Sequence, residues 1–133
     1  MVAELKRNDG SPISYPTGCA FDGGLLWFVE LDESDKEFGI RAFDLKRNEI
    51  IHWVRSADKA MAGIAWDEKR FWISSRDGGF YEVEREAALH YGSVDKARGA
   101  GFRGKYVQLA YGLGHLWGLD SDARVIHKIK ITD

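Results

Sequence analysis

Short apolar runs separated by turn residues recur three times along the chain. The segment 63–73 contains two such runs, and similar segments lie at 18–28 and 108–118. The interval is constant, because an alanine followed by an aromatic residue stands at positions 20, 65 and 110, and a tryptophan at positions 27, 72 and 117. A repeat of about forty to fifty residues built from short strands is typical of a β-propeller blade, which is a sheet of four strands.

Within each repeat, the turn residues between apolar runs predict where the strands begin and end. Asp22-Gly23-Gly24 joins two apolar runs directly, which is a strong signal for a hairpin. The chain shows no long apolar stripe of helical period, so we expect an all-β protein. The expected strands lie at 18–21, 25–29, 40–45 and 49–54 in the first repeat, at 63–66, 70–74, 80–84 and 87–91 in the second, and at 107–111, 115–119 and 125–131 in the third.

The third repeat ends before a fourth strand, whereas an extra strand precedes the first repeat. Apolar and polar residues alternate over 2–6, which predicts a strand with one buried face. We expect one domain over 1–133. It is divided into an N-terminal strand and linker at 2–17, blade 1 at 18–61, blade 2 at 62–107 with a glycine-rich insertion at 92–105, and blade 3 at 108–133.

Three blades are too few for a closed β-propeller, which typically has about 4 to 8 blades. We therefore interpret the chain as half of a six-bladed propeller. An open arc of blades would leave two apolar sheet faces in water, and such a patch favours association. We therefore expect two copies of the chain to close a six-bladed propeller as a homodimer. The strand at 2–6 would complete the third blade of the partner, so that the two copies exchange their N-terminal strands.

The composition supports a packed core and narrows the range of partners. The chain is 44% hydrophobic, which is ample for a globular domain, and its formal net charge is −2. Because acids and bases are interspersed, we expect neither a nucleic acid nor a membrane as partner. Cys19 is the single cysteine, which excludes an internal disulfide. Residues 1–6 lack the apolar run of a signal peptide, so we expect a cytoplasmic location.

A motif at the start of the first repeat carries a resemblance to known propellers. It reads Pro16-Thr17-Gly18-x-Ala20-Phe21-Asp22-Gly23-x-x-Leu26-Trp27 and is echoed by Ala62-Gly63-Ile64-Ala65-Trp66-Asp67. The pattern resembles the blade consensus of the NHL and YVTN repeat proteins and of the glutamine-cyclotransferase-like and virginiamycin-B-lyase-like proteins. The resemblance covers nearly the whole chain apart from 92–105. It implies the propeller fold and no particular chemistry, because turn and packing positions are shared by enzymes and scaffolds.

Three aspartates recur at one position of the repeat and are candidate ligand-binding residues. Asp32, Asp77 and Asp122 each follow a tryptophan by five residues. The connection between the second and third strands of a blade lies on the same face of a propeller as the connection between blades. In a dimer, the aspartates would form an acidic rim that favours cations or polyols. The alternative is that aspartate simply suits turns.

Basic residues near the same loops are candidate contacts for a ligand, in particular an anion. They are Arg76 and, on the insertion between the second and third repeats, Arg98, Arg103 and Lys105 together with Lys96. The glycines at 99, 101 and 104 have the spacing of nucleotide-binding motifs, but such motifs open a helix, and here Tyr106 and an expected strand follow. We therefore expect no nucleotide and no other cofactor, and the insertion is interpreted as a connection between blades.

Metal binding is not expected either. The acidic run at 30–37 lacks the glycine and terminal glutamate spacing of a calcium loop. The four histidines have no cysteine or histidine neighbours at the spacing of a zinc site.

Two functions of different classes remain. The first is a non-catalytic binding module that holds a small ligand or partner at the channel mouth or the inter-blade loops. The alternative is a small lyase or hydrolase with a metal-assisted acidic site at that mouth.

Overall fold

A computed structural model describes the fold of most of the chain, in which β-strands account for nearly all of the regular structure. The described residues are 15–32, 37–56, 61–76, 78–86, 88, 93–94 and 105–129. The strands are β1 (Tyr15–Phe21), β2 (Leu26–Asp32), β3 (Glu37–Asp44), β4 (Glu49–Ser56), β5 (Met61–Trp66), β6 (Arg70–Ser75), β7 (Phe80–Glu84), β8 (Ser93–Val94), β9 (Gln108–Gly112), β10 (His115–Asp120) and β11 (Val125–Ile129).

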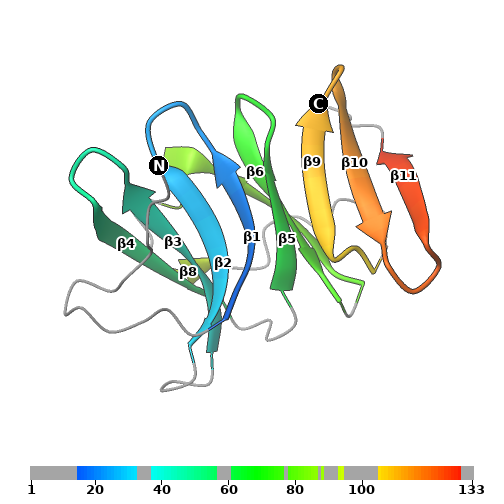
Figure 1. The fold of residues 1–133 in the computed structure, drawn as a ribbon, viewed down its shortest axis with the longest axis horizontal. Helices are drawn as coiled ribbons and strands as arrows, with labels where there is room; N and C mark the ends of the chain where they lie inside the picture. The colour runs from blue at the N-terminus through cyan, green and yellow to red at the C-terminus, as the bar shows by residue number, and fades with distance from the viewer. Residues whose placement is uncertain are drawn as a thin grey trace.

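The strands form three separate sheets, one for each sequence repeat. The first sheet has the order β1-β2-β3-β4-β8, the second β5-β6-β7 and the third β9-β10-β11. All pairs are antiparallel except β4 with β8. In Figure 1 the first strands of the three sheets, β1, β5 and β9, stand next to one another, and the remaining strands of each sheet lead away from them. The all-β prediction is confirmed, and the three repeats build three different sheets, except that β8 of the second repeat adds to the edge of the first sheet.

The strands run so that equivalent turns gather at the same end of the molecule. We call the end at which β1, β5 and β9 finish the turn end, and the end at which β2, β6 and β10 finish the loop end. The turn end is uppermost in Figure 1 and the loop end is lowermost. Successive antiparallel strands of a sheet run in opposite directions between these two ends. Residues that are far apart in the sequence are therefore brought to the same end by the topology alone.

The three first strands meet closely near their starting residues. The hydroxyl of Thr17 in β1 donates a 2.8 Å hydrogen bond to the carbonyl of Ala62 in β5. The side-chain amide of Gln108 in β9 donates a 2.8 Å bond to the carbonyl of Thr17. A Cβ on Gly63 would lie 2.6 Å from Ser74 Oγ and 3.0 Å from the amide nitrogen of Leu109. Glycine is therefore required at Gly63 by close approach of the neighbouring strand.

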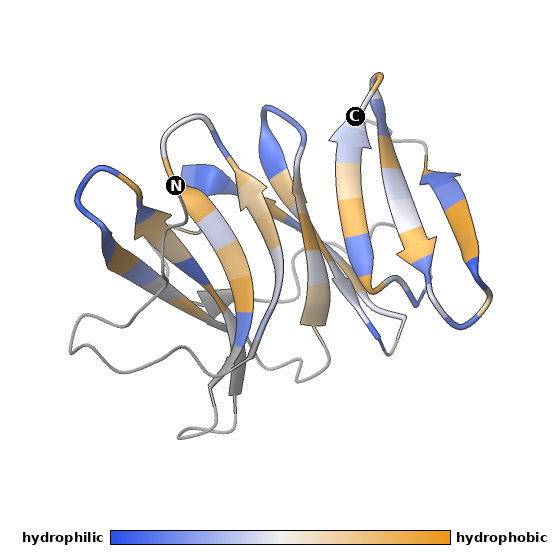
Figure 2. Cartoon of the chain, in the orientation of Figure 1, coloured by the Kyte–Doolittle hydropathy of each residue, from blue (hydrophilic) through white to orange (hydrophobic). Residues whose placement is uncertain are grey.

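Apolar side chains fill the space between successive sheets. One cluster joins Trp27, Val29 and Ile40 of the first sheet to Ile64 and Phe71 of the second. A second cluster joins the second and third sheets; it contains Ala65, Trp72, Phe80, Tyr106, Leu109, Leu116 and Ile129. Figure 2 shows the apolar bands along these strands and the polar turns at their ends. Burial between sheets is therefore the main source of stability.

The opposite face of the first sheet holds a smaller cluster. Phe28, Phe43 and Ile50 are buried there, and Leu26 packs against them. On the same face, Phe21 remains 53% exposed. The same face also holds a buried ion pair between Arg41 and Glu30, so it is apolar only in part.

The second repeat differs from the sequence prediction after β7. Of the fourth strand expected at 87–91, only Ala88 lies within the described residues, and it has helical backbone, as do Arg85 and Glu86 just before it. The physical reason is tertiary packing. Ala88 is buried in the cluster between the first two sheets, and its carbonyl accepts a 2.8 Å hydrogen bond from His52 Nε2 in β4. Further on, β8 pairs with β4 in parallel, inside the segment expected to be a plain insertion.

Candidate functional site

The described part of the chain places four of the eight predicted ligand-binding residues at the loop end. Asp32 is the last residue of β2, Arg76 directly follows β6, and Asp122 lies in the turn between β10 and β11. Lys105 precedes β9, which starts at this end. The side chains of Arg76, Lys105 and Asp122 are exposed. The other predicted residues, Asp77, Lys96, Arg98 and Arg103, lie outside the described residues.

These four residues share an end of the molecule but belong to different sheets. Asp32 lies in the first sheet, Arg76 follows a strand of the second, and Asp122 lies in the third. Among the described residues, no three His, Cys, Asp or Glu side chains are grouped so that they could hold a metal ion. The four residues therefore carry charges of both signs and are held by different strands and turns. Ligand binding by these residues remains a prediction.

The turn end contains a different carboxylate site, which the sequence analysis did not single out. The Oδ2 atom of Asp22 accepts a 2.8 Å hydrogen bond from Trp27 Nε1. Its Oδ1 atom accepts bonds from the backbone amides of Gly24, at 2.8 Å, and Leu25, at 2.7 Å. One carboxylate thus fixes both the hairpin turn and the indole ring of the following strand.

The second repeat builds the same arrangement from the equivalent residues. Asp67 Oδ2 accepts a 2.8 Å hydrogen bond from Trp72 Nε1, and its Oδ1 accepts the amides of Lys69 and Arg70 at 2.9 and 2.8 Å. In the third repeat the equivalent position is Gly112. There the backbone carbonyl accepts a 3.0 Å bond from Trp117 Nε1. Each tryptophan therefore keeps an acceptor, but only two of the three acceptors are charged.

The environment of the two carboxylates keeps them ionised. Burial raises the pKa of Asp22, but hydrogen bonds from Leu25, Arg85, Trp27 and Gly24 outweigh this and lower it below its ordinary value. Burial also raises the pKa of Asp67, and the bonds from Trp72, Arg70 and Lys69 with the charge of Arg70 again produce a net lowering. Hydrogen bonds to the charged form explain both directions. Neither carboxylate is suited to take up a proton near neutral pH.

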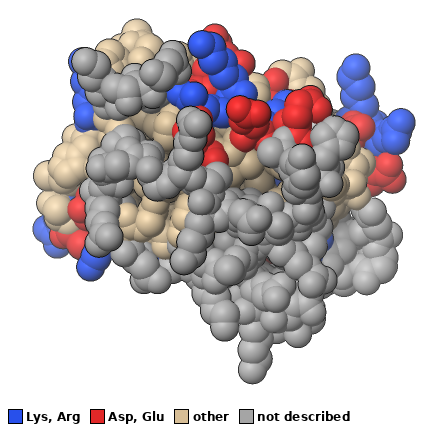
Figure 3. Space-filling model, turned by 180° about the vertical axis from the view of Figure 1, so that it is seen from behind, with Lys and Arg blue, Asp and Glu red and all other residues tan. Residues whose placement is uncertain are grey.

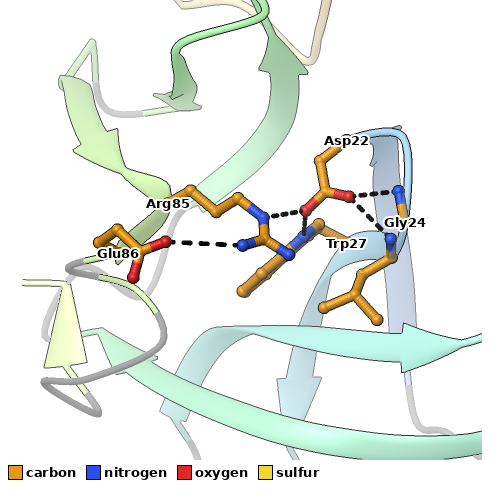
Figure 4. Close-up of polar contacts among 6 residues, drawn as sticks. Asp22, Gly24, Trp27, Arg85 and Glu86 are labelled. Carbon is orange, nitrogen blue, oxygen red and sulfur yellow. Dashed lines mark hydrogen bonds and ion pairs between the residues drawn. The ribbon is translucent and has the colours of Figure 1, made fainter.

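Arginine side chains complete this charged group and link two sheets. Arg85 Nε lies 2.7 Å from Asp22 Oδ2, so the second repeat is tied to the turn of the first. Figure 4 shows Arg85 reaching across to Asp22, with Glu86 on its other side. In the second repeat, Arg70 pairs with Asp67 at 3.3 Å and with Glu82 at 3.0 Å. Seen from behind in Figure 3, side chains of both signs gather along the upper edge.

Tyr106 anchors the chain where it enters the third sheet. Its carbonyl accepts a 2.9 Å hydrogen bond from the hydroxyl of Ser74, and its hydroxyl lies 2.9 Å from Nδ1 of His127. A Cβ on Gly118 would lie 2.6 Å from the tyrosine ring, so the ring rests directly on this glycine. Burial, with a smaller effect of Asp120, raises the pKa of the Tyr106 hydroxyl. The residue therefore stays neutral and serves to fix the third sheet against the second.

The spacing that reveals the turn-end carboxylates is present in the sequence. Asp22 and Asp67 each precede a tryptophan by five residues, whereas the sequence analysis considered the aspartates that follow each tryptophan by five. Strand register explains the contact. Ala20 lies opposite Trp27, so Asp22, two residues further on, lies on the same face as the indole ring.

Comparison with known proteins yields a likeness of fold. No protein-family model matches the chain, and no curated protein does. Among solved structures, the chain is similar to the crystal structure of the computationally designed Ika4 protein, with 12% identity and a TM-score of 0.52 over 99% of this chain and 100% of that chain. It also matches the extracellular domain of a B. thetaiotaomicron protein described as a one-component system, with 15% identity and a TM-score of 0.48 over 85% of this chain and 25% of that chain.

Proposed function

We propose that the chain is a non-catalytic binding module of the β-propeller type that holds a small ligand or a partner at its loop end. The observation that carries the proposal is that predicted ligand-binding residues at the loop end are exposed, whereas the two turn-end carboxylates bonded to tryptophans are not. At the turn end, Asp22 and Asp67 are committed to tryptophan and backbone hydrogen bonds. At the loop end, Arg76, Lys105 and Asp122 are exposed. Exposed charges on loops carried by rigid strands suit recognition.

The same observation favours binding over the alternative of a metal-assisted lyase or hydrolase. General acid and base catalysis works best when the pKa of the group is near the working pH. The pKa values of Asp22 and Asp67 are instead lowered from an already acidic range. Their hydrogen bonds explain this fully as a structural role. Asp22 and Asp67 are therefore ionised at neutral pH, so they are no general acids and at most weak bases.

The binding proposal is tested by titrating sorbitol, a polyol, into the protein in a calorimeter. We expect sorbitol to bind, and Asp122→Asn to weaken that binding by about tenfold, because a charge-assisted contact is lost. Asp44→Asn is the matched control. Asp44 caps the turn between β3 and β4 at the turn end, where its Oδ1 accepts the amide of Lys46 at 2.9 Å. A heat of sorbitol binding that is unchanged by Asp122→Asn, or that is absent, would contradict the proposal.

We also propose that two copies close one six-bladed ring and exchange their N-terminal strands. The edge of the third sheet supports this proposal. Within the described residues, β11 is the last strand of that sheet, whereas the first sheet has the antiparallel strand β4 beyond β3. An unpaired strand edge is a template for a strand from another chain. The exchanging strand at 2–6 lies outside the described residues.

Deleting residues 2–6 tests the exchange. Without the strand that completes the partner's third sheet, we expect the dimer dissociation constant to rise by roughly tenfold or more, because main-chain hydrogen bonds across the sheet edge are lost. Sedimentation equilibrium measures this constant. A deletion variant that dimerises as tightly as the full chain would contradict strand exchange.

A further inference from the structure

The third sheet presents to solvent the same face that the other two sheets bury. This face carries the tryptophan of each repeat. In the first sheet, Val29 and Ile40 lie opposite each other on it, and both are 0% exposed. In the second sheet the equivalent pair is Ser74 and Phe80, at 0% and 3%. In the third sheet it is Leu119 and Ile126, at 40% and 68%.

The contrast follows from the order of the sheets. The tryptophan face of the first sheet packs against the second sheet, and that of the second sheet packs against the third. Among the described residues, no further sheet follows the third. Ala110 shows the same effect on the inner strand, because it is exposed whereas its equivalent Ala65 is 3% exposed. Figure 2 shows an apolar band in β11, the last strand of this sheet. An exposed apolar face of this kind favours association.

A face that could pack against the exposed tryptophan face of the third sheet lies on the first sheet, at the other end of the row of sheets. We call the contact between two successive sheets a seam. In each seam within the chain, the tryptophan face of one sheet packs against the opposite face of the next sheet. The rings of Trp27 and Phe71 lie 4.9 Å apart across the first seam. Residues equivalent to Phe71 are Leu116, buried in the second seam, and Leu26 on the first sheet. Leu26 therefore occupies the position that would receive the tryptophan of a preceding sheet.

Two neighbours of Leu26 on that face are also exposed where their equivalents are not. Cys19 is exposed, whereas its equivalents Ile64 and Leu109 are 0% and 6% exposed. Phe21 is 53% exposed, whereas its equivalent Trp66 packs against Phe71 with ring centroids 4.7 Å apart. The Cys19, Phe21 and Leu26 region is therefore built like the receiving faces of the second and third sheets, while Phe28, Phe43 and Ile50 on the same face are already buried within one copy.

We infer that the tryptophan face of the third sheet docks on the Cys19, Phe21 and Leu26 region of the first sheet of a second copy. In this seam, Trp117 of one copy contacts the position of Leu26 in the other. The contact is a third instance of the packing that already joins the three sheets of one chain. It deepens the ring closure proposed above and rests on it, because it names the two surfaces that meet.

A two-fold assembly satisfies both faces of both copies. A contact between two different faces closes into a ring only when the rotation per copy allows it, and otherwise it produces a filament. Two copies of three sheets give six, which lies within the range of about 4 to 8 blades in closed propellers, whereas three copies would give nine. The occupant of the exposed face is therefore a single second copy, and the dimer contains two identical seams.

The test combines light scattering with the reactivity of Cys19, the single cysteine of the chain. The full chain should have twice the mass of one copy, and its thiol should react slowly with a disulfide reagent until dilution dissociates the dimer. Ile126→Glu should raise the dissociation constant by roughly a hundredfold, because a charge is buried in each seam, and should expose the thiol. Its fold should persist, because Ile126 is 68% exposed within the chain. Ala110→Glu is a second variant with the same expected result.

Leu113→Glu is the matched control, because Leu113 is 91% exposed in the turn before β10, away from the sheet face. This variant should remain dimeric with a protected thiol. A dimer that persists in both Ile126→Glu and Ala110→Glu would overturn the seam while leaving ring closure through another surface in place. A full chain that is monomeric with a reactive thiol at micromolar concentration would overturn both. Neither result depends on the calorimetric test of ligand binding.

Discussion

Phe71→Ala is expected to lower the free energy of unfolding by about 3–5 kcal/mol, because truncating a buried aromatic side chain removes its transfer free energy and leaves a cavity. Phe71 is 0% exposed. Its ring lies 4.9 Å from that of Trp27 in the first sheet and 4.7 Å from that of Trp66 in its own. The substitution thus removes the centre of the contact between two sheets. Urea denaturation followed by tryptophan fluorescence measures the change.

The control for this prediction is Leu113→Ala, at a side chain that is 91% exposed. It should change the free energy of unfolding by no more than about 0.5 kcal/mol, because it removes little buried surface. A loss below about 1 kcal/mol in Phe71→Ala would contradict the description of Phe71 as the residue that joins the first two sheets.

Asp67→Ala is expected to cost on the order of 3 kcal/mol at neutral pH, because it leaves buried donors without an acceptor and removes one partner of an ion pair. The carboxylate is 5% exposed and accepts the indole N–H of Trp72 at 2.8 Å. The substitution also removes the carboxylate that pairs with Arg70 at 3.3 Å, while the pair of Arg70 with Glu82 at 3.0 Å is kept. The matched control is Asp122→Ala in an exposed turn, which should change stability by less than about 0.5 kcal/mol.

The cost of Asp67→Ala should depend on pH in a defined direction. The pKa of Asp67 is lowered in the folded state, so the unfolded chain binds the proton more readily. The stability from this carboxylate is fully present above the unfolded pKa of about 3.9 and is lost as pH falls through the lower folded value. The difference between the natural chain and the variant should therefore be largest near pH 6 and should shrink below about pH 4. A difference independent of pH over this range would contradict the role of the charge.

The strands were predictable because each depends on a local apolar run bounded by turn residues. The expected strand at 63–66 lies inside β5, Met61–Trp66, and the expected strand at 115–119 lies inside β10, His115–Asp120. Ala88, within the strand expected at 87–91, could not be assigned in this way. Ala88 takes helical backbone because it is buried between two sheets and bonded to His52, which stands 36 residues earlier. Local propensity does not contain such a contact.

The candidate site was predictable only in part, for the same reason. Equivalent loops fall at one end by topology, so the sequence repeat was enough to bring Asp32, Arg76 and Asp122 to the loop end. The turn-end carboxylates depend on strand register, which places Asp22 beside Trp27, and on Arg85, which stands 63 residues away from Asp22. No spacing rule for a single hairpin indicates an arginine that arrives from the next sheet.

The uncharged acceptor at Gly112 gives the third sheet a different response to acid from the other two. Protonation of Asp22 or Asp67 weakens a turn that holds its tryptophan through a carboxylate. The carbonyl of Gly112 holds Trp117 without any ionisable group. As the solution is acidified, local unfolding should therefore begin in the first two sheets. The amide hydrogens of β9 and β10 should be the last to lose their protection from exchange with solvent.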